Sequence, residues 1–203
     1  MNKYFFEGKN YDDAIKNATN ELNTQESDLI VNIVEEKKGI LKKSTKIEIV
    51  SINDLINYLK EEIKELVSLM GIQANLEVRR IEKTISLTIF SDNNSILIGK
   101  NGKTIQAIQD IIRQTIPQNI NNKVKIIVDV ENYKAKKGEI IEKTAKKIAK
   151  EVSQTGVEAK LECMNSYERR IVHNAVNEIS GVVTKSEGEE PNRYIVISVR
   201  KED

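Results

Sequence analysis

The stretch Ser95-Ile96-Leu97-Ile98-Gly99-Lys100-Asn101-Gly102-Lys103-Thr104 decides how the middle of this chain is interpreted. Its end, Gly102-Lys103-Thr104, looks like the end of a P-loop. That motif requires another glycine five positions before Gly102, where this chain has Leu97. An NTPase is therefore a poor interpretation, and a Gly-x-x-Gly loop between two helices fits better. Since a plain helix–helix turn is the commoner origin of this spacing, the surrounding sequence has to decide.

The surrounding sequence predicts a helix–strand–strand–helix–helix–strand unit. Apolar residues recur every three or four positions over 52–70 and again over 105–115, and Gly71 is placed to cap the first of these helices. Apolar and polar residues alternate over 76–78, 85–89 and 124–130, as in half-buried strands. Because the two glycines fall between the central helices of such a unit, a loop that binds nucleic acid is favoured over a plain turn.

The chemistry of this loop suits a sugar-phosphate backbone. Gly99 and Gly102 have no side chains, so a backbone can approach the main chain closely. The amides of residues 100–103 lie at the start of the following helix, whose dipole favours phosphate oxygens. The cationic side chains of Lys100 and Lys103 add charge without selecting a base, and the segment Ile96, Leu97 and Ile98 is expected to wall a groove for bases. The predicted binding residues here are Gly99, Lys100, Asn101, Gly102 and Lys103.

The first fifty residues predict a smaller strand–helix–strand–strand unit, with strands over 4–6, 29–34 and 45–50 and a helix over 14–22. Between the last two strands lies Lys37-Lys38-Gly39, a glycine turn bracketed by lysines. A solvated hairpin is the interpretation that the residues favour, and a phosphate-contacting loop is the functional alternative.

The last seventy residues predict a third unit, with helices over 138–154 and from 166 onward, and strands over 157–161, 182–186 and 194–199. Asn165 and Glu168 have the spacing of a capping box for the second helix. Opposite the apolar stripe of the first helix runs a basic stripe that would contact RNA, made of Lys143, Lys146, Lys147 and Lys150.

Arg169 and His173 are four residues apart, so both project from one face of the second of these helices. An arginine can hold a phosphate through two hydrogen bonds, and a neutral histidine can stack on a base or donate one bond. With Arg170 beside them and Arg193 on the following loop they form a predicted anion site. The alternative, at close to even odds, is a structural histidine that is hydrogen-bonded to a neighbouring strand. Cys163 is predicted to be a small buried residue.

Composition limits the classes of function. The 203 residues carry 32 basic and 31 acidic side chains, a formal net charge of +1, and a single cysteine and a single histidine. No paired acid and base or set of metal ligands is apparent, so we expect no catalytic residues, no metal and no cofactor. No apolar run approaches the roughly 18 residues of a membrane span, and no signal-peptide core is present, so we expect a cytoplasmic protein without membrane insertion.

These motifs resemble a known family. The middle unit resembles a KH domain of the bacterial topology, whose Gly-x-x-Gly loop clamps about four nucleotides of a single strand. The pair Arg169 and His173 matches the Arg-x-x-x-His domain. The strings over 164–173 and 186–193, with Lys37-Lys38-Gly39, extend the resemblance over nearly the whole chain to the Jag family of SpoIIIJ-associated proteins. The sequence departs from the family pattern at Cys163 and Ser166, where proline is common, and after Gly39, where Phe-Leu-Gly usually follows.

The fold class expected is α+β, with three small α/β-sandwich domains in tandem. They are a β-α-β-β Jag N-terminal domain over 1–51, a KH-like α-β-β-α-α-β domain over 52–131 and a small helix/strand nucleic-acid-binding domain, the Arg-x-x-x-His domain, over 132–203.

The function expected is that of a non-enzymatic, single-stranded RNA-binding protein. The resemblance implies an RNA chaperone or post-transcriptional regulator linked to cell-wall growth and cell shape, with a small single-KH protein as partner; a homodimer stays open. The alternative is a protein–protein adaptor of the cell elongation or division machinery with incidental RNA binding, for which the nearly neutral first unit is the hint.

Overall fold

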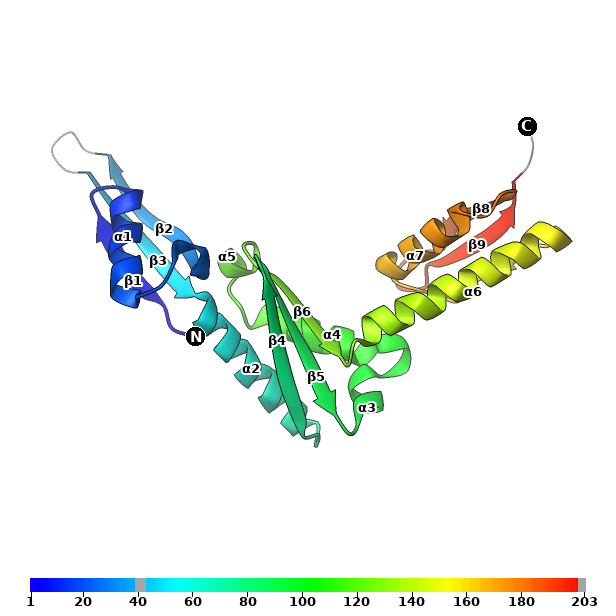
Figure 1. Ribbon diagram of the computed structural model, residues 1–203, viewed down its shortest axis with the longest axis horizontal. Helices are drawn as coiled ribbons and strands as arrows, with labels where there is room; N and C mark the ends of the chain where they lie inside the picture. The colour runs from blue at the N-terminus through cyan, green and yellow to red at the C-terminus, as the bar shows by residue number, and fades with distance from the viewer. Residues whose placement is uncertain (39–42, 201–203) are drawn as a thin grey trace. The chain divides into compact units, whose positions relative to one another are not determined.

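The structure, a computed structural model, describes residues 1–38 and 43–200 and divides into two compact units, 1–131 and 132–203 (Figure 1). Three three-stranded sheets organise it, two in the first unit and one in the second. Each sheet packs helices against one face and pairs only with its own strands. The predicted fold class, α+β with small domains in tandem, is therefore confirmed.

The first sheet has the predicted strand–helix–strand–strand order. Its elements are β1 (Tyr4–Gly8), α1 (Tyr11–Leu22), the 3-10 turn η1 (Glu26–Asp28), β2 (Leu29–Lys38) and β3 (Lys43–Ser51), with β3 in the middle of an antiparallel sheet. Helix α1 begins because the side chain of Asn10 accepts a hydrogen bond from the Asp13 amide, at 2.8 Å. Its Ala14 and Ala18 pack on Phe6, Ile47 and Ile49 to form the core of this domain.

The second sheet belongs to the predicted helix–strand–strand–helix–helix–strand unit, to which the structure adds two short turns. The elements are α2 (Ile52–Leu69), β4 (Ala74–Ile81), β5 (Thr84–Ser91), α3 (Asn94–Ile98), the 3-10 turn η2 (Lys100–Gly102), α4 (Lys103–Gln114), α5 (Gln118–Asn121) and β6 (Lys125–Val130). Strand β5 lies in the middle, antiparallel to β4 and parallel to β6. As predicted, Gly71 follows α2 with a φ of 76°, which a glycine adopts readily.

Helix α4 is fixed to this sheet by apolar and polar contacts. Ile105, Ile108 and Ile112 are buried against the face of the sheet that α2 and α4 cover. The buried Gln109 side chain accepts a hydrogen bond from the Val128 amide of β6, at 3.1 Å. Because a buried, hydrogen-bonded amide fixes one arrangement of its neighbours, the start of α4 has a defined position on the sheet.

The first two domains contact each other within the unit 1–131. Ser51 is the last residue of β3 and also the N-cap of α2, where its hydroxyl accepts from the Asp54 amide at 3.0 Å. Arg80 of β4 forms an ion pair with Asp28 and donates a hydrogen bond to the main-chain oxygen of Ser27, at 2.7 Å. The chain therefore passes from one domain to the other without a linker.

The third sheet forms the unit 132–203. Its elements are α6 (Tyr133–Thr155), β7 (Ala159–Lys160), α7 (Ser166–Asn177), β8 (Val182–Glu187) and β9 (Tyr194–Val199), and β9 lies in the middle of an antiparallel sheet. Both helices cover one face, with Ala145, Ala149, Val172 and Val176 against Ile195. The predicted start of α6 at Gly138 is wrong, because the helix begins at Tyr133. A Cβ at residue 138 would lie 3.3 Å from Cδ1 of Ile171, so this glycine marks a close approach to α7 and not a helix end.

Candidate nucleic-acid interface

The loop between α3 and α4 has a backbone that only glycine fits at its first position. Gly99 has a φ of 67° and a ψ of −177°, and a Cβ there would lie 2.0 Å from Oγ1 of Thr104 and 3.1 Å from its main-chain nitrogen. Asn101 and Gly102 also have positive φ, 56° and 81°. The main chain therefore turns sharply between the two helices, and residue 99 leaves no room for a side chain.

The loop delivers polar groups to the start of α4. Lys100, Asn101 and Lys103 are exposed. Gly102 is the N-cap of α4 and provides no side-chain hydrogen bond to the amides of the first turn. An N-terminus of this kind, with cationic side chains beside it, favours an anion such as a phosphate. The structure therefore brings together all five of the predicted loop residues, and their binding to RNA stays a prediction.

The apolar wall predicted beside this loop needs one correction. Leu97 is fully buried beneath α3, so it belongs to the core of the domain and cannot line a groove. Ile96 is exposed and Ile98 is half-buried. The helical turn of α3 sends these neighbouring side chains in different directions, and Ile96 presents the largest apolar surface next to the loop.

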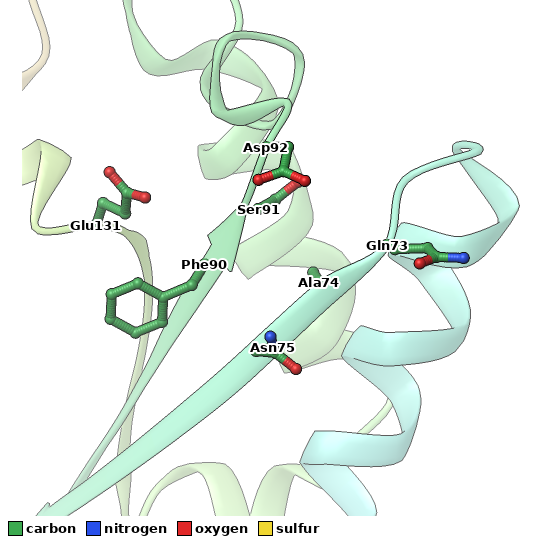
Figure 2. A pocket seen from close by; sticks show the side chains of 7 residues that line it. All are labelled: Gln73, Ala74, Asn75, Phe90, Ser91, Asp92 and Glu131. Atoms are coloured by element: carbon green, nitrogen blue, oxygen red, sulfur yellow. The ribbon is translucent and has the colours of Figure 1, made fainter.

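The hollow that lies on the same domain is acidic. A cavity of about 400 Å³ at one end of the sheet is lined by Gln73, Ala74, Asn75, Phe90, Ser91, Asp92 and Glu131 (Figure 2). Asp92 and Glu131 both carry carboxylates, which repel a phosphate. This cavity therefore does not extend the phosphate-binding surface of the glycine loop.

The second candidate region is the N-terminal half of α7. The predicted capping box is confirmed: the Asn165 side chain accepts from the Glu168 amide at 3.0 Å, and the Glu168 carboxylate accepts from the Asn165 amide at 3.1 Å. The other oxygen of Glu168 lies 2.5 Å from Nζ of Lys137 on α6. These contacts fix the start of the helix from which Arg169, Arg170 and His173 project.

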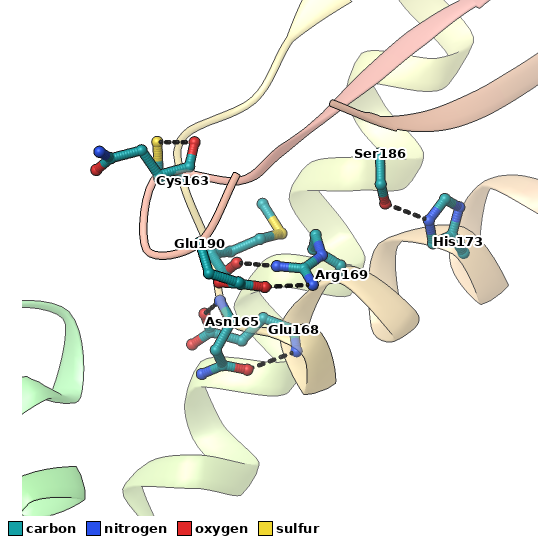
Figure 3. Close-up of polar contacts among 9 residues, drawn as sticks. Cys163, Asn165, Glu168, Arg169, His173, Ser186 and Glu190 are labelled. Carbon is teal, nitrogen blue, oxygen red and sulfur yellow. Dashed lines mark hydrogen bonds and ion pairs between the residues drawn. The ribbon is translucent and has the colours of Figure 1, made fainter. Parts of the chain in front are cut away.

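Arg169 makes its contacts inside the domain. Its guanidinium donates to the main-chain oxygen of Met164 at 2.8 Å and pairs with the carboxylate of Glu190 at 2.7 Å (Figure 3). Only 8% of its side chain is exposed. A phosphate can reach this guanidinium only by replacing Glu190, a contact that sequence reasoning missed because Glu190 lies 21 positions further along the chain. The resemblance over 186–193 was the one signal that pointed to this loop.

His173 has the geometry of the structural alternative. Its Nδ1 lies 2.6 Å from Oγ1 of Thr184, and its Nε2 lies 3.1 Å from Oγ of Ser186, both on β8. Burial lowers the pKa of the imidazole, and the nearby charge of Arg169 lowers it further. The ring therefore stays neutral at neutral pH and ties α7 to the sheet through both nitrogens. A direct role of His173 in RNA binding is still an untested prediction.

The remaining residues of the predicted anion site differ in access. Arg170 is exposed, and none of the residues that the structure describes forms an ion pair or hydrogen bond with its side chain. Arg193 is half-buried, its main-chain oxygen accepts from the Met164 amide at 3.0 Å, and its Nε is buried without a hydrogen-bond partner. Cys163, predicted to be buried, is exposed, because it lies in the segment before α7 where its thiol donates to the Asn192 main-chain oxygen at 3.1 Å.

The lysines predicted as further contacts are not equivalent. Lys146 lies 2.8 Å from carboxylates of both Glu142 and Glu178, whereas Lys143, Lys147 and Lys150 are exposed. In the first domain, Lys37 pairs with Glu35 at 3.2 Å and Lys38 is the last residue of β2. Gly39 lies outside the described residues, so the proposed phosphate-contacting loop there is untested.

Two searches of the described residues concern other classes of site. Within 1–38 and 43–200, no cluster of three or more histidine, cysteine or carboxylate side chains has an arrangement that would hold a metal ion. Over the same residues, no helix combines the length and the apolar character that crossing a membrane requires.

Comparison with known proteins defines the class first. The chain matches three domain families: the Jag N-terminus over residues 6–50, the KH domain over 54–135 and the Arg-x-x-x-His domain over 139–199. A KH fold with its Gly-x-x-Gly loop is a module for single-stranded nucleic acid. The protein is thus a three-domain chain that combines a KH module and an Arg-x-x-x-His module.

Full-length comparison identifies the family. The chain is 32% identical to RNA-binding protein KhpB of Clostridium symbiosum over 202 residues, which cover 96% of this chain and 90% of the relative. It is 28% identical to RNA-binding protein KhpB of Bacillus subtilis (strain 168), over 96% of this chain and 97% of the relative. A third KhpB, from Lactiplantibacillus plantarum, is 31% identical over 74% of this chain and 46% of the relative. The chain belongs to the KhpB family, also called the Jag family.

Proposed function

We propose that this protein is a cytoplasmic, non-enzymatic protein that binds single-stranded RNA through its KH and Arg-x-x-x-His domains. It acts as an RNA chaperone or post-transcriptional regulator in cell-wall growth and cell shape, and a small single-KH protein is its partner. The names of three relatives as RNA-binding proteins support the ligand class. The family resemblance is the basis for the cellular role and for the partner, and a homodimer is compatible with both.

The loop around Gly99 carries the proposal. Its sharp turn places exposed Lys100, Asn101 and Lys103 around the start of α4, where no side chain caps the first amides. Phosphate oxygens accept hydrogen bonds from such amides, and the lysines neutralise the charge. Because none of these groups reads a base edge, the loop binds the backbone of many sequences.

The Arg-x-x-x-His domain contributes a second backbone contact. Arg170 points to solvent and is available to a phosphate, whereas Arg169 and His173 hold the surrounding loop and strand. Arg193 lies on the same loop as Glu190, and its unpaired Nε is a donor that a bound phosphate can use. Arg170 is therefore the first contact in this domain, and Arg169 and Arg193 join when the loop opens.

The test replaces the two exposed residues between the loop glycines with acids. In Lys100→Asp/Asn101→Asp, two carboxylates stand where a phosphate binds, so we expect the affinity for a fluorescent single-stranded RNA to fall more than about tenfold. Fluorescence anisotropy measures the affinity, and circular dichroism checks that both proteins are folded. Both glycines are kept, so the backbone of the loop stays accessible to the chain.

A matched control carries the same change in charge elsewhere. Asn57 and Lys64 are exposed on α2, so Asn57→Asp/Lys64→Asp alters the net charge equally without touching the loop. Near wild-type affinity is expected for this control. Equal affinity of all three proteins would contradict the assignment of the loop.

A further inference from the structure

Helix α6 has two opposite faces of different chemistry. Ala145, Ala149 and Val152 pack into the core of the domain. At about 100° per residue, Lys136, Lys143, Lys147 and Lys150 all project within about 40° of one direction, opposite to that core. All four are exposed. The outer face of α6 is defined here as these four lysines and Ile140, which lies among them.

The other lysines of this helix that have printed partners are already neutralised. Lys146 lies between Glu142 and Glu178, and Lys137 pairs with Glu168 of α7. Across the residues that the structure describes, no carboxylate forms an ion pair with any of the four outer lysines. Acids therefore compensate the lysines that turn toward α7, and the outer face keeps its positive charge.

The outer face also has an apolar residue in its row of cations. Ile140 is 64% exposed and lies between Lys136 and Lys143, one turn from each. Its own domain leaves most of this side chain uncovered. A strand of nucleic acid offers both complements to such a surface, since its phosphates pair with lysines and its ribose or base rings contact apolar groups.

We propose that the outer face of α6 binds the sugar-phosphate backbone of single-stranded RNA as a surface separate from the glycine loop and from Arg170. At about 1.5 Å per residue, the four lysines extend over about 21 Å, long enough for several consecutive phosphates. This inference rests on the proposed function. It changes the sequence-based set of contacts by adding Lys136 and Ile140 and removing Lys146, whose charge is used within the domain.

The experiment measures how salt affects binding of the full chain to a fluorescent poly(U) RNA of about 30 nucleotides. Each phosphate contact contributes about 0.7 to the slope of log K against log salt on a single strand. The variant with Lys136, Lys143, Lys147 and Lys150 all changed to glutamine is expected to lose about 2.8 from the magnitude of the slope and more than about tenfold in affinity at low salt. Glutamine has a helix propensity close to that of lysine, and circular dichroism verifies the fold.

Two controls separate a specific surface from a general effect of charge. Lys9, Lys16, Lys60 and Lys64 lie in the first unit, and changing all four to glutamine removes the same charge from a different part of the chain; the wild-type slope is expected. The single variants Lys147→Gln and Lys146→Gln compare neighbours, of which only the first should lower the slope. An unchanged slope in the four-lysine α6 variant, or an equal change in both four-lysine variants, would overturn the proposal.

Comparison with Lys100→Asp/Asn101→Asp distinguishes this proposal from the proposed function. If that variant loses affinity while the α6 variant keeps its slope, RNA binding stands and the outer face of α6 is not part of it. The outer face would then be tested for an acidic protein segment. If neither variant binds more weakly than the wild type, both proposals are wrong.

Discussion

Arg169 and Glu190 form an ion pair that fastens the loop between β8 and β9 to the start of α7, with 2.7 Å between Nη2 and Oε1 (Figure 3). The guanidinium is almost completely buried, whereas 57% of the Glu190 side chain is exposed. A carboxylate and a phosphate present similar oxygens to an arginine. Glu190 therefore occupies the position in which a phosphate would bind Arg169.

The Glu190→Gln variant tests whether this carboxylate competes with RNA. Removing its charge leaves Arg169 with a weaker partner, so we expect the affinity for single-stranded RNA to rise severalfold. The slope of log K against log salt should become steeper by up to about 0.7, since one more phosphate is neutralised. Fluorescence anisotropy at several salt concentrations measures both quantities.

Glu189 provides the matched control, because it is an exposed neighbour whose side chain has no ion pair or hydrogen bond within the described residues. Glu189→Gln removes the same charge from the same loop and should change affinity less. Equal gains in the two variants would mean that only the overall charge matters and that Arg169 does not contact RNA.

His173 predicts a pH dependence of stability. Burial and the charge of Arg169 lower the pKa of the folded imidazole, so the unfolded chain takes up its proton first, near a pH of about 6.5. The stabilisation is complete above about pH 6.5 and is lost as the pH falls toward the lower pKa of the folded state. Urea unfolding of wild type and His173→Gln between about pH 7.5 and pH 5.5 should show a smaller loss of stability in the variant. Parallel curves would show that His173 does not titrate differently in the two states.

Local sequence signals predicted the features that depend on neighbouring residues. The element order of the KH domain follows from hydrophobic periodicity, and the cap at Gly71 and the capping box of Asn165 and Glu168 require only residues within one or two turns. The glycine loop was found for the same reason. Its backbone geometry is set by Gly99 and the adjacent start of α4.

The failures involve partners far apart in the sequence. Periodicity gave the apolar face of α6 correctly, but it could not show that Lys146 meets Glu178 of another segment while Lys147 does not. Gly138 was interpreted as a helix start because glycine is a poor helix former, whereas the side chain of Ile171 explains its presence. The contact of Arg169 with Glu190 is likewise set by the packing of a loop.

Glu168 predicts a graded loss of stability. One of its oxygens accepts from the Asn165 amide and the other pairs with Lys137. Glu168→Gln keeps an acceptor for the capping box but loses the ion pair, and Glu168→Ala loses both. We expect the alanine variant to be destabilised by about 2 kcal/mol and the glutamine variant by about half of that. Urea unfolding monitored by circular dichroism measures both, and equal losses would show that the capping contact contributes nothing.

Gly99 and Gly71 form a matched pair for the role of the loop backbone. Both have positive φ, 67° and 76°, but an added Cβ at residue 99 overlaps Thr104, whereas none of the described atoms lies within 4 Å of one at residue 71. Gly71→Ala therefore costs only backbone strain, about 1 kcal/mol. Gly99→Ala must also displace the start of α4, and we expect it to lose about 3 kcal/mol. Urea unfolding measures the stabilities, and anisotropy should show weaker RNA binding for Gly99→Ala alone at a temperature where both variants are folded. Equal RNA affinities of these two variants would separate the geometry of the loop from binding and contradict its role in holding the phosphate backbone.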